Sequence, residues 1–196
     1  FAKEGLDSPM LLAAACARGQ EVPARLAKAW VGWLPHREKR QPPVLATWVD
    51  DHVVRDAVAW ASGQDDPPIL WYEHRAVGDR LVAESGWVRF AAGDDRVLAE
   101  VTHTRPAVLS IRSHGQGKNL QIWGNQIIVA PIRTGVTVEQ LLGRTHRQGQ
   151  ARDEVHATFY THGFFGTALA DAREGARTIE ATTGQVQRLC YAAWAR

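Results

Sequence analysis

The segment Gln140–Gln150 carries two arginines and a glutamine at helical spacing. On a helix, Gln140, Arg144 and Arg147 occupy positions i, i+4 and i+7, so their side chains share one face. A planar guanidinium donates two parallel hydrogen bonds to phosphate and keeps its charge in proteins. The spacing therefore predicts a helix face that grips phosphate. The alternative, a solvated basic surface, is disfavoured because Gly143 and Gly149 would weaken an ordinary surface helix.

The rest of this predicted helix is expected to face the protein interior. Its inward positions are apolar or small: Val138, Leu141, Leu142 and Thr145. Thr137 and Gln140 have the three-residue spacing of a capping box, which predicts that the helix begins at Thr137.

A second candidate for anion binding is the glycine-containing loop from Ser113 to Gln121. Glycines let the backbone approach a ligand closely, and His114 and Lys118 add hydrogen-bond donors. The alternative is a tight turn. The loop is not a P-loop, because the spacing GxxxxGK[ST] occurs nowhere in this sequence.

Strand-like and helix-like patterns alternate after residue 67. Short apolar runs predict strands at 69–72, 87–90, 107–111, 126–130 and 155–160. Helical patterns fall between them at 75–84, at 96–103 and around Gln140, and a largely helical tail covers 164–196. This order predicts an α/β domain with a mainly parallel sheet sandwiched by helices. Both candidate segments are expected at the carboxyl ends of strands, where such sheets bind ligands.

Residues 1–66 form a helical segment in this interpretation. Helices are predicted at 11–17, at 23–34 with Pro35 ending it, and after Pro42 and Pro43 with an apolar stripe reaching Ala61. A polar cluster with two prolines at 63–68 predicts a boundary, which divides the chain into domains 1–66 and 67–196.

Composition places these elements in a globular protein. The chain has 196 residues, 45% hydrophobic and 22% charged, with a net charge of +2, so any basic site must be local. No apolar run approaches the roughly 20 residues that span a bilayer, and no signal peptide pattern is present. Two distant cysteines favour reduced thiols and a cytoplasmic location. The eight histidines show no ligand spacing, so no metal site is expected. The start at Phe1 suggests a piece of a longer protein.

The glycine loop followed by the arginine segment resembles motifs five and six of superfamily 2 helicases. The last motif of Swi/Snf-type DNA translocases reads QxxxRxHRxGQ, and six positions here match it: Gln140, Arg144, His146, Arg147, Gly149 and Gln150. Residues 143–147 followed by 153–155 look most like the phage and plasmid branch, which implies the cytoplasm of a bacterial host. Residues 69–75 resemble motif four, which opens the second RecA-like lobe. The resemblance covers about residues 67–162.

The resemblance implies roles for individual residues. Arg144 and Arg147 would be arginine fingers that reach ATP and Mg²⁺ held mainly by an N-terminal RecA-like lobe. Gln140, Gly117 and Asn119 would contact the nucleotide or couple its cleft to nucleic acid. The partner would be DNA, double-stranded in this group, contacted by three loop residues: His114, Lys118 and Gln121.

The first lobe's nucleotide-binding loop and acidic DExH segment are missing from this sequence, so this chain alone is expected to be inactive. Residues 1–66 match no motif and would be an interlobe segment or an insertion. A non-catalytic nucleic-acid-binding or adaptor module is the alternative function. A small-molecule enzyme is disfavoured, since no catalytic constellation is visible. Of the eight tryptophans, most are expected in the core, whereas Trp123 is a candidate for base stacking.

Overall fold

The computed structural model describes residues 9–37, 47–90, 104–115, 117 and 119–194. It forms two compact units, Phe1–Thr47 and Trp48–Arg196. This division differs from the boundary expected near residue 66, because the helix before that boundary packs on the sheet of the second unit. The domain role of residues 1–66 stays a prediction.

The first unit contains two helices, α1 (Pro9–Ala17) and α2 (Ala24–Arg37). Among the described residues of this unit, the buried side chains are those of Leu12, Ala15 and Leu26. Pro35 was expected to end the second helix, but α2 continues through it to Arg37. A proline has a helical φ angle, and so close to a helix end it removes only one backbone hydrogen bond.

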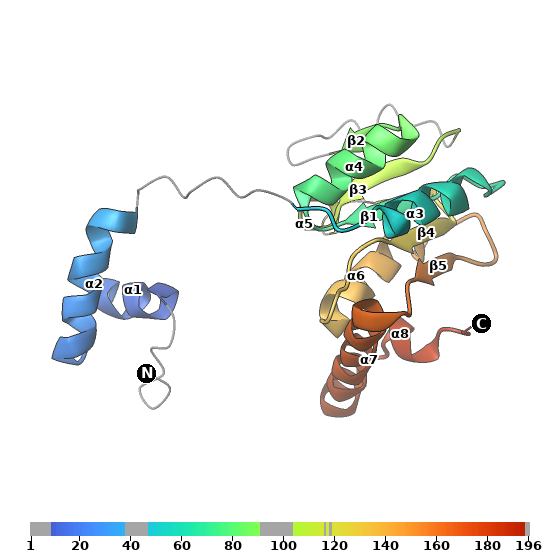
Figure 1. Cartoon of the computed structure of the whole chain (residues 1–196). Coiled ribbons are helices and arrows are strands. Elements are labelled where there is room, and N and C mark those ends of the chain that lie inside the picture. Colours follow the sequence, from blue (N-terminus) through green and yellow to red (C-terminus); the bar gives the residue numbers. More distant parts are fainter. Residues whose placement is uncertain (1–8, 38–46, 91–103, 116, 118, 195–196) are drawn as a thin grey trace. The chain divides into compact units, whose positions relative to one another are not determined.

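The second unit is built on a five-stranded sheet in which every pair is parallel, in the order β2-β3-β1-β4-β5 (Figure 1). The strands are β1 (Ile69–Tyr72), β2 (Arg89–Phe90), β3 (Ala107–Ser110), β4 (Asn125–Ile128) and β5 (His156–Phe159). The helices are α3 (His52–Ser62), α4 (Arg75–Ser85), α5 (Ile111–His114), α6 (Gly135–Thr145), α7 (Gly163–Thr183) and α8 (Arg188–Tyr191). The predicted α/β class and parallel sheet are confirmed. The helix predicted at 96–103 lies outside the described residues.

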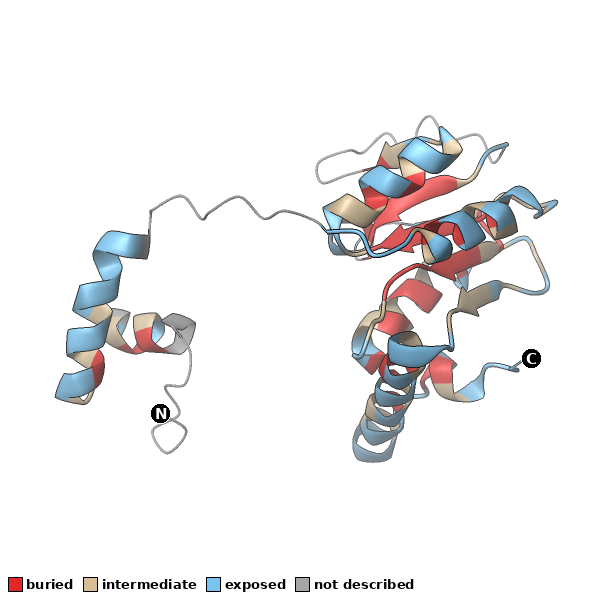
Figure 2. Cartoon of the chain, viewed as in Figure 1, coloured by how far each residue is buried: buried red, intermediate tan, exposed pale blue. Residues whose placement is uncertain are grey.

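Helices cover both faces of the sheet, and alternate residues of each strand supply the two cores. Ile69 and Trp71 of β1 pack on the face covered by α6 and the segment before β4. Leu70 and Tyr72 pack on the opposite face, against α3 and α4. The buried residues lie along the sheet and the helix faces turned toward it (Figure 2). Beyond α6, a third cluster joins it to α7 and α8.

Two helices begin at positions other than those expected. The helix α3 starts at His52, whose backbone N–H donates to Asp50 Oδ1 at 2.9 Å, and residues 47–51 are not helical. The helix α6 starts at Gly135, so Thr134 is its N-cap residue and the capping box at Thr137 is wrong. The first residue of α6 packs closely against α7. A Cβ on Gly135 would lie 2.6 Å from the backbone of both Ala172 and Ala176, so only glycine fits there.

Candidate functional site

The arginine-bearing end of α6 lies at the amino edge of the sheet. Thr145, the last residue of α6, accepts a hydrogen bond from Gln126 Nε2 at 2.9 Å, and Gln126 is the second residue of β4. The backbone N–H of Leu120 donates to Arg144 O at 3.2 Å. The expectation of a site at the carboxyl edge is therefore wrong for the arginines. A helix that connects two parallel strands runs opposite to them, so its last turn returns to the edge where the next strand begins.

Arg147 lies beyond the helix, in the turn of residues 146–149, so the three-residue helix face does not form as predicted. The two guanidiniums nevertheless contact one loop. Arg144 Nε donates to Gly115 O at 3.0 Å, and Arg147 Nη1 donates to Asn119 Oδ1 at 2.6 Å. The structure thus joins the two segments that the sequence analysis singled out.

The electrostatics of this arginine pair favour an anion. Arg144 is half-buried and Arg147 is exposed. Burial, followed by the positive charge of Arg147, lowers the pKa of Arg144 below the ordinary arginine value. A negatively charged ligand beside the pair would offset both effects, because it attracts each cation and screens their mutual repulsion.

A buried chain of hydrogen bonds fixes the end of α6 to the sheet. Trp71 Nε1 donates to Gln126 Oε1 at 2.8 Å, and Gln126 Nε2 donates in turn to Thr145 Oγ1. All three side chains are fully buried. The prediction that Val138, Leu141, Leu142 and Thr145 face inward is confirmed. These hydrogen bonds fix Thr145, which lies between Arg144 and Arg147 in the sequence, to a rigid part of the core.

The glutamine that ends the motif pattern has a structural role. Gln150 Nε2 donates to the carbonyls of Trp123 and Thr145, both at 3.0 Å, and so closes the turn that carries Arg147. Gly149 supports this turn with a φ of +91°, in the left-handed region that favours glycine. Trp123 is fully buried in the core and offers no face for base stacking.

The remaining predicted residues surround the same loop with different accessibility. Gly117 is exposed with a φ of +73°, and Asn119 is also exposed. Gln140 and Gln121 are half-buried. His114 is only 1% exposed, which leaves little of it on the surface. Lys118 lies outside the described residues.

Two further arginines hold the site in place, and the sequence analysis missed both. Arg188 of α8 donates to Glu139 Oε1 at 2.7 Å and to His146 Nδ1 at 3.3 Å, so the tail clamps α6. Arg152 donates to Ile122 O at 2.7 Å and pairs with Asp66. Arg152 follows the motif by two residues, which was a usable signal. No local pattern marks Arg188, which is 49 residues from its carboxylate partner.

No helix within the described ranges is long and apolar enough to cross a membrane. Over the same part of the chain, no three histidine, cysteine or acidic side chains gather as metal ligands would.

Comparison with known proteins identifies the fold. No protein-family model and no curated protein matches the sequence. A solved structure, "Crystal structure of the C-terminal part of Fun30 ATPase domain", matches with a TM-score of 0.52 and 19% sequence identity. The match covers 76% of this chain and 53% of that one, so the chain spans about half the length of that structure. The second unit accordingly has the α/β architecture of a RecA-like lobe. Its fold is similar to that of the C-terminal part of an ATPase domain.

Proposed function

We propose that this chain is the C-terminal motor lobe of an ATP-dependent DNA helicase or translocase of the Swi/Snf type, in its phage or plasmid branch. Arg144 and Arg147 would then act as arginine fingers on ATP held by an N-terminal RecA-like lobe. The observation that carries the proposal is the pair of guanidiniums held on one loop, with Arg147 exposed. The match to QxxxRxHRxGQ and the similarity to part of an ATPase domain support it.

The donor set fits a phosphate group. Arg144 donates to a backbone carbonyl and Arg147 to a side-chain amide, and both of these oxygens are neutral. A phosphate oxygen would replace them with charge-assisted bonds, which are about twice as strong. ATP with Mg²⁺ supplies the phosphoryl group that is transferred to water. Arg144 and Arg147 would neutralise charge that develops on that group, an effect of about 10³–10⁵ in rate for arginine fingers.

The same contacts would couple nucleotide to DNA. Arg144 contacts Gly115 and Arg147 contacts Asn119, so a shift of either guanidinium toward a nucleotide would break its own bond to the loop. That loop would form part of the track for double-stranded DNA through Lys118 and Gln121, and Asn119 would couple the track to the nucleotide. His114 and Gly117 would shape the loop. The protein would act in the cytoplasm of a bacterial host.

The test is DNA-stimulated ATP hydrolysis by the full-length protein that supplies the first lobe. We expect Arg147→Ala to lower the rate by about 10³-fold or more while the fold is retained. Arg177→Ala is the matched control, because Arg177 is an exposed arginine of α7 that pairs with Glu174 three residues away. Near-normal turnover of the Arg147→Ala protein would refute the finger assignment.

The alternative is a non-catalytic nucleic-acid-binding or adaptor module. The coding sequence upstream of Phe1 separates the two: a GxxxxGK[ST] loop and a DExH segment there support the motor. Their absence, together with salt-sensitive DNA binding by this chain, would support the module.

A further inference from the structure

A pocket of about 240 Å³ lies at the opposite edge of the sheet from the arginines. Glu73 and His74 follow the carboxyl end of β1, and Val129 to Pro131 follow that of β4. From β1 the chain proceeds through α4 to β2 on one side, and from β4 through α6 to β5 on the other. The pocket therefore occupies the topological switch point, where open parallel sheets bind ligands.

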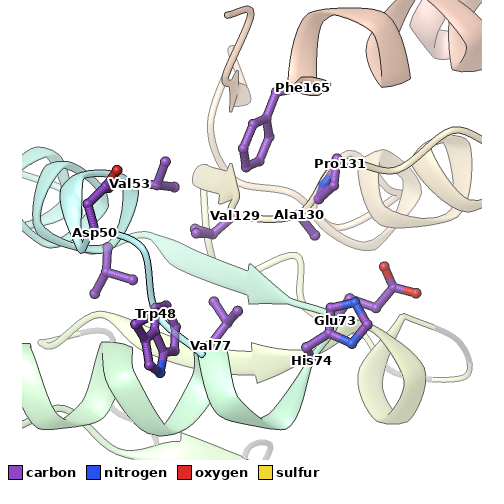
Figure 3. A pocket seen from close by; sticks show the side chains of 11 residues that line it. Trp48, Asp50, Val53, Glu73, His74, Val77, Val129, Ala130, Pro131 and Phe165 are labelled. Carbon is purple, nitrogen blue, oxygen red and sulfur yellow. The ribbon is translucent and has the colours of Figure 1, made fainter. Parts of the chain in front are cut away.

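The walls of the pocket are apolar and come from separate elements. Figure 3 shows Trp48, Val53 and Phe165 around the space, with Val77 from α4 and Pro131 from the loop after β4. Trp48 is 41% exposed, so part of its ring is available to a ligand. Covering an apolar wall of this kind with another apolar group lowers the free energy, because both surfaces are removed from water.

The size of the pocket restricts what it can hold. Sites for drug-sized molecules have volumes of about 300–1,000 Å³, and this pocket is smaller. It fits a single bulky side chain, which is how the anchor residue of a peptide binds in a protein interface.

The rim is acidic. Asp50, Glu73 and His74 line the pocket, and none of the described lysines and arginines does. Within the part of the chain that the structure describes, neither carboxylate forms an ion pair. Arg80 lies 5.9 Å from the centre of the Trp48 ring, but it is paired with Asp51. Such a rim repels phosphate and attracts a cation.

We propose that this pocket binds a partner peptide through one large apolar side chain, with a basic residue on either side of it held by Asp50 and by Glu73, which lie at opposite ends of the pocket (Figure 3). The apolar walls bind the anchor and the carboxylates select the flanking charge. The site uses none of the residues assigned to ATP or DNA, so this inference is independent of the proposed function.

The test is fluorescence anisotropy with the 196-residue chain and a fluorescein-labelled peptide, Gly-Lys-Trp-Arg-Gly. We expect saturable binding that is about tenfold weaker or worse for Gly-Lys-Ala-Arg-Gly, because the anchor is lost. Gly-Glu-Trp-Glu-Gly should also bind more weakly. Equal binding of the acidic and basic peptides, or no saturable binding below about 1 mM, would overturn the proposal.

Two variants locate the binding on the protein. Reversing the rim with Asp50→Lys and Glu73→Lys should weaken binding of the basic peptide about 2- to 30-fold, since two exposed ion pairs are lost. Asp65→Lys with Glu84→Lys makes the same charge change at exposed residues outside the pocket and should have no effect. Val53→Phe should fill the space and abolish binding, with thermal unfolding as the check on folding.

Unchanged affinity in the rim variant would overturn the proposal. A DNA duplex provides a further check. If the duplex displaces the peptide, and also binds the Val53→Phe protein less tightly than the original protein, the pocket accepts nucleic acid and the proposal is overturned.

Discussion

Replacing Thr145 by valine tests whether the buried hydrogen-bond chain fixes the arginine-bearing end of α6. Valine has the shape of threonine, so the change leaves no cavity. It removes the oxygen that accepts from Gln126 Nε2 at 2.9 Å, in a place with no access to water. The amide of Gln126 would keep its other bond, from Trp71 Nε1. The perturbation is therefore a single unsatisfied buried donor.

The expected loss of stability is that of one unsatisfied buried donor. An unsatisfied buried polar group costs about 1–3 kcal/mol. The bond from Thr145 Oγ1 to Leu142 O is 3.4 Å long and adds little. For a chain of this length, 1 kcal/mol lowers Tm by about 2–4 °C, so Thr145→Val should lower it by about 2–12 °C.

The assay is urea unfolding followed by circular dichroism, with Thr178→Val as the control. Thr178 lies on α7, is exposed, and donates to Glu174 O at 3.0 Å, so the same chemical change there should cost less than about 0.5 kcal/mol. If the two variants differ by less than about 0.5 kcal/mol, the hydrogen-bond chain does not hold the helix end.

The close approach of α6 to α7 and the half-buried Tyr160 give further predictions. Gly135→Ala should lower the free energy of unfolding by about 1–3 kcal/mol, because its Cβ would meet the backbone of α7 at 2.6 Å. Gly175→Ala, where the nearest atom is 3.6 Å away, should instead be neutral or raise it by up to about 1 kcal/mol; urea unfolding compares the two, and equal effects would contradict the packing argument. Burial raises the pKa of Tyr160, and the hydrogen bond that it donates to Asp56 and the negative charge of Asp56 raise it further. The free energy of unfolding should therefore fall as the pH rises above about 10, the pKa of tyrosine in the unfolded chain, toward the higher pKa of Tyr160 in the folded protein. Tyr160→Phe should make this fall shallower, as measured by urea unfolding at several pH values. An equally steep fall in the variant would show that other groups cause it.

The sequence predicted most of the fold because short apolar runs are a local signal for strands. Each of the five apolar runs became a strand, although the run at 87–90 became a strand of only two residues. The errors occur where distant contacts decide. Gly135, the first residue of α6, packs against the backbone of Ala172 and Ala176 in α7, and no local capping pattern encodes that contact.

The structure brings the two arginines to the glycine loop, but at a different edge of the sheet from the one predicted. The motif pattern identified Arg144 and Arg147, and the structure puts both on the loop that was expected to accompany them. The predicted sheet edge was wrong for the arginines. The segment that contains them starts after the carboxyl end of β4, but α6 carries them back to the amino edge. Arg188 could not be found, since its contacts with Glu139 and His146 join segments more than 40 residues apart.

The contacts between α8 and α6 imply that the C-terminal tail and the arginine-bearing helix change together in evolution. Glu139 receives both the Arg188 guanidinium and, at 3.3 Å, the backbone N–H of Leu189. Related sequences that replace Glu139 by a neutral or basic residue should therefore change position 188 as well. The tail should vary in step with the arginine helix, as if the two were neighbours in sequence.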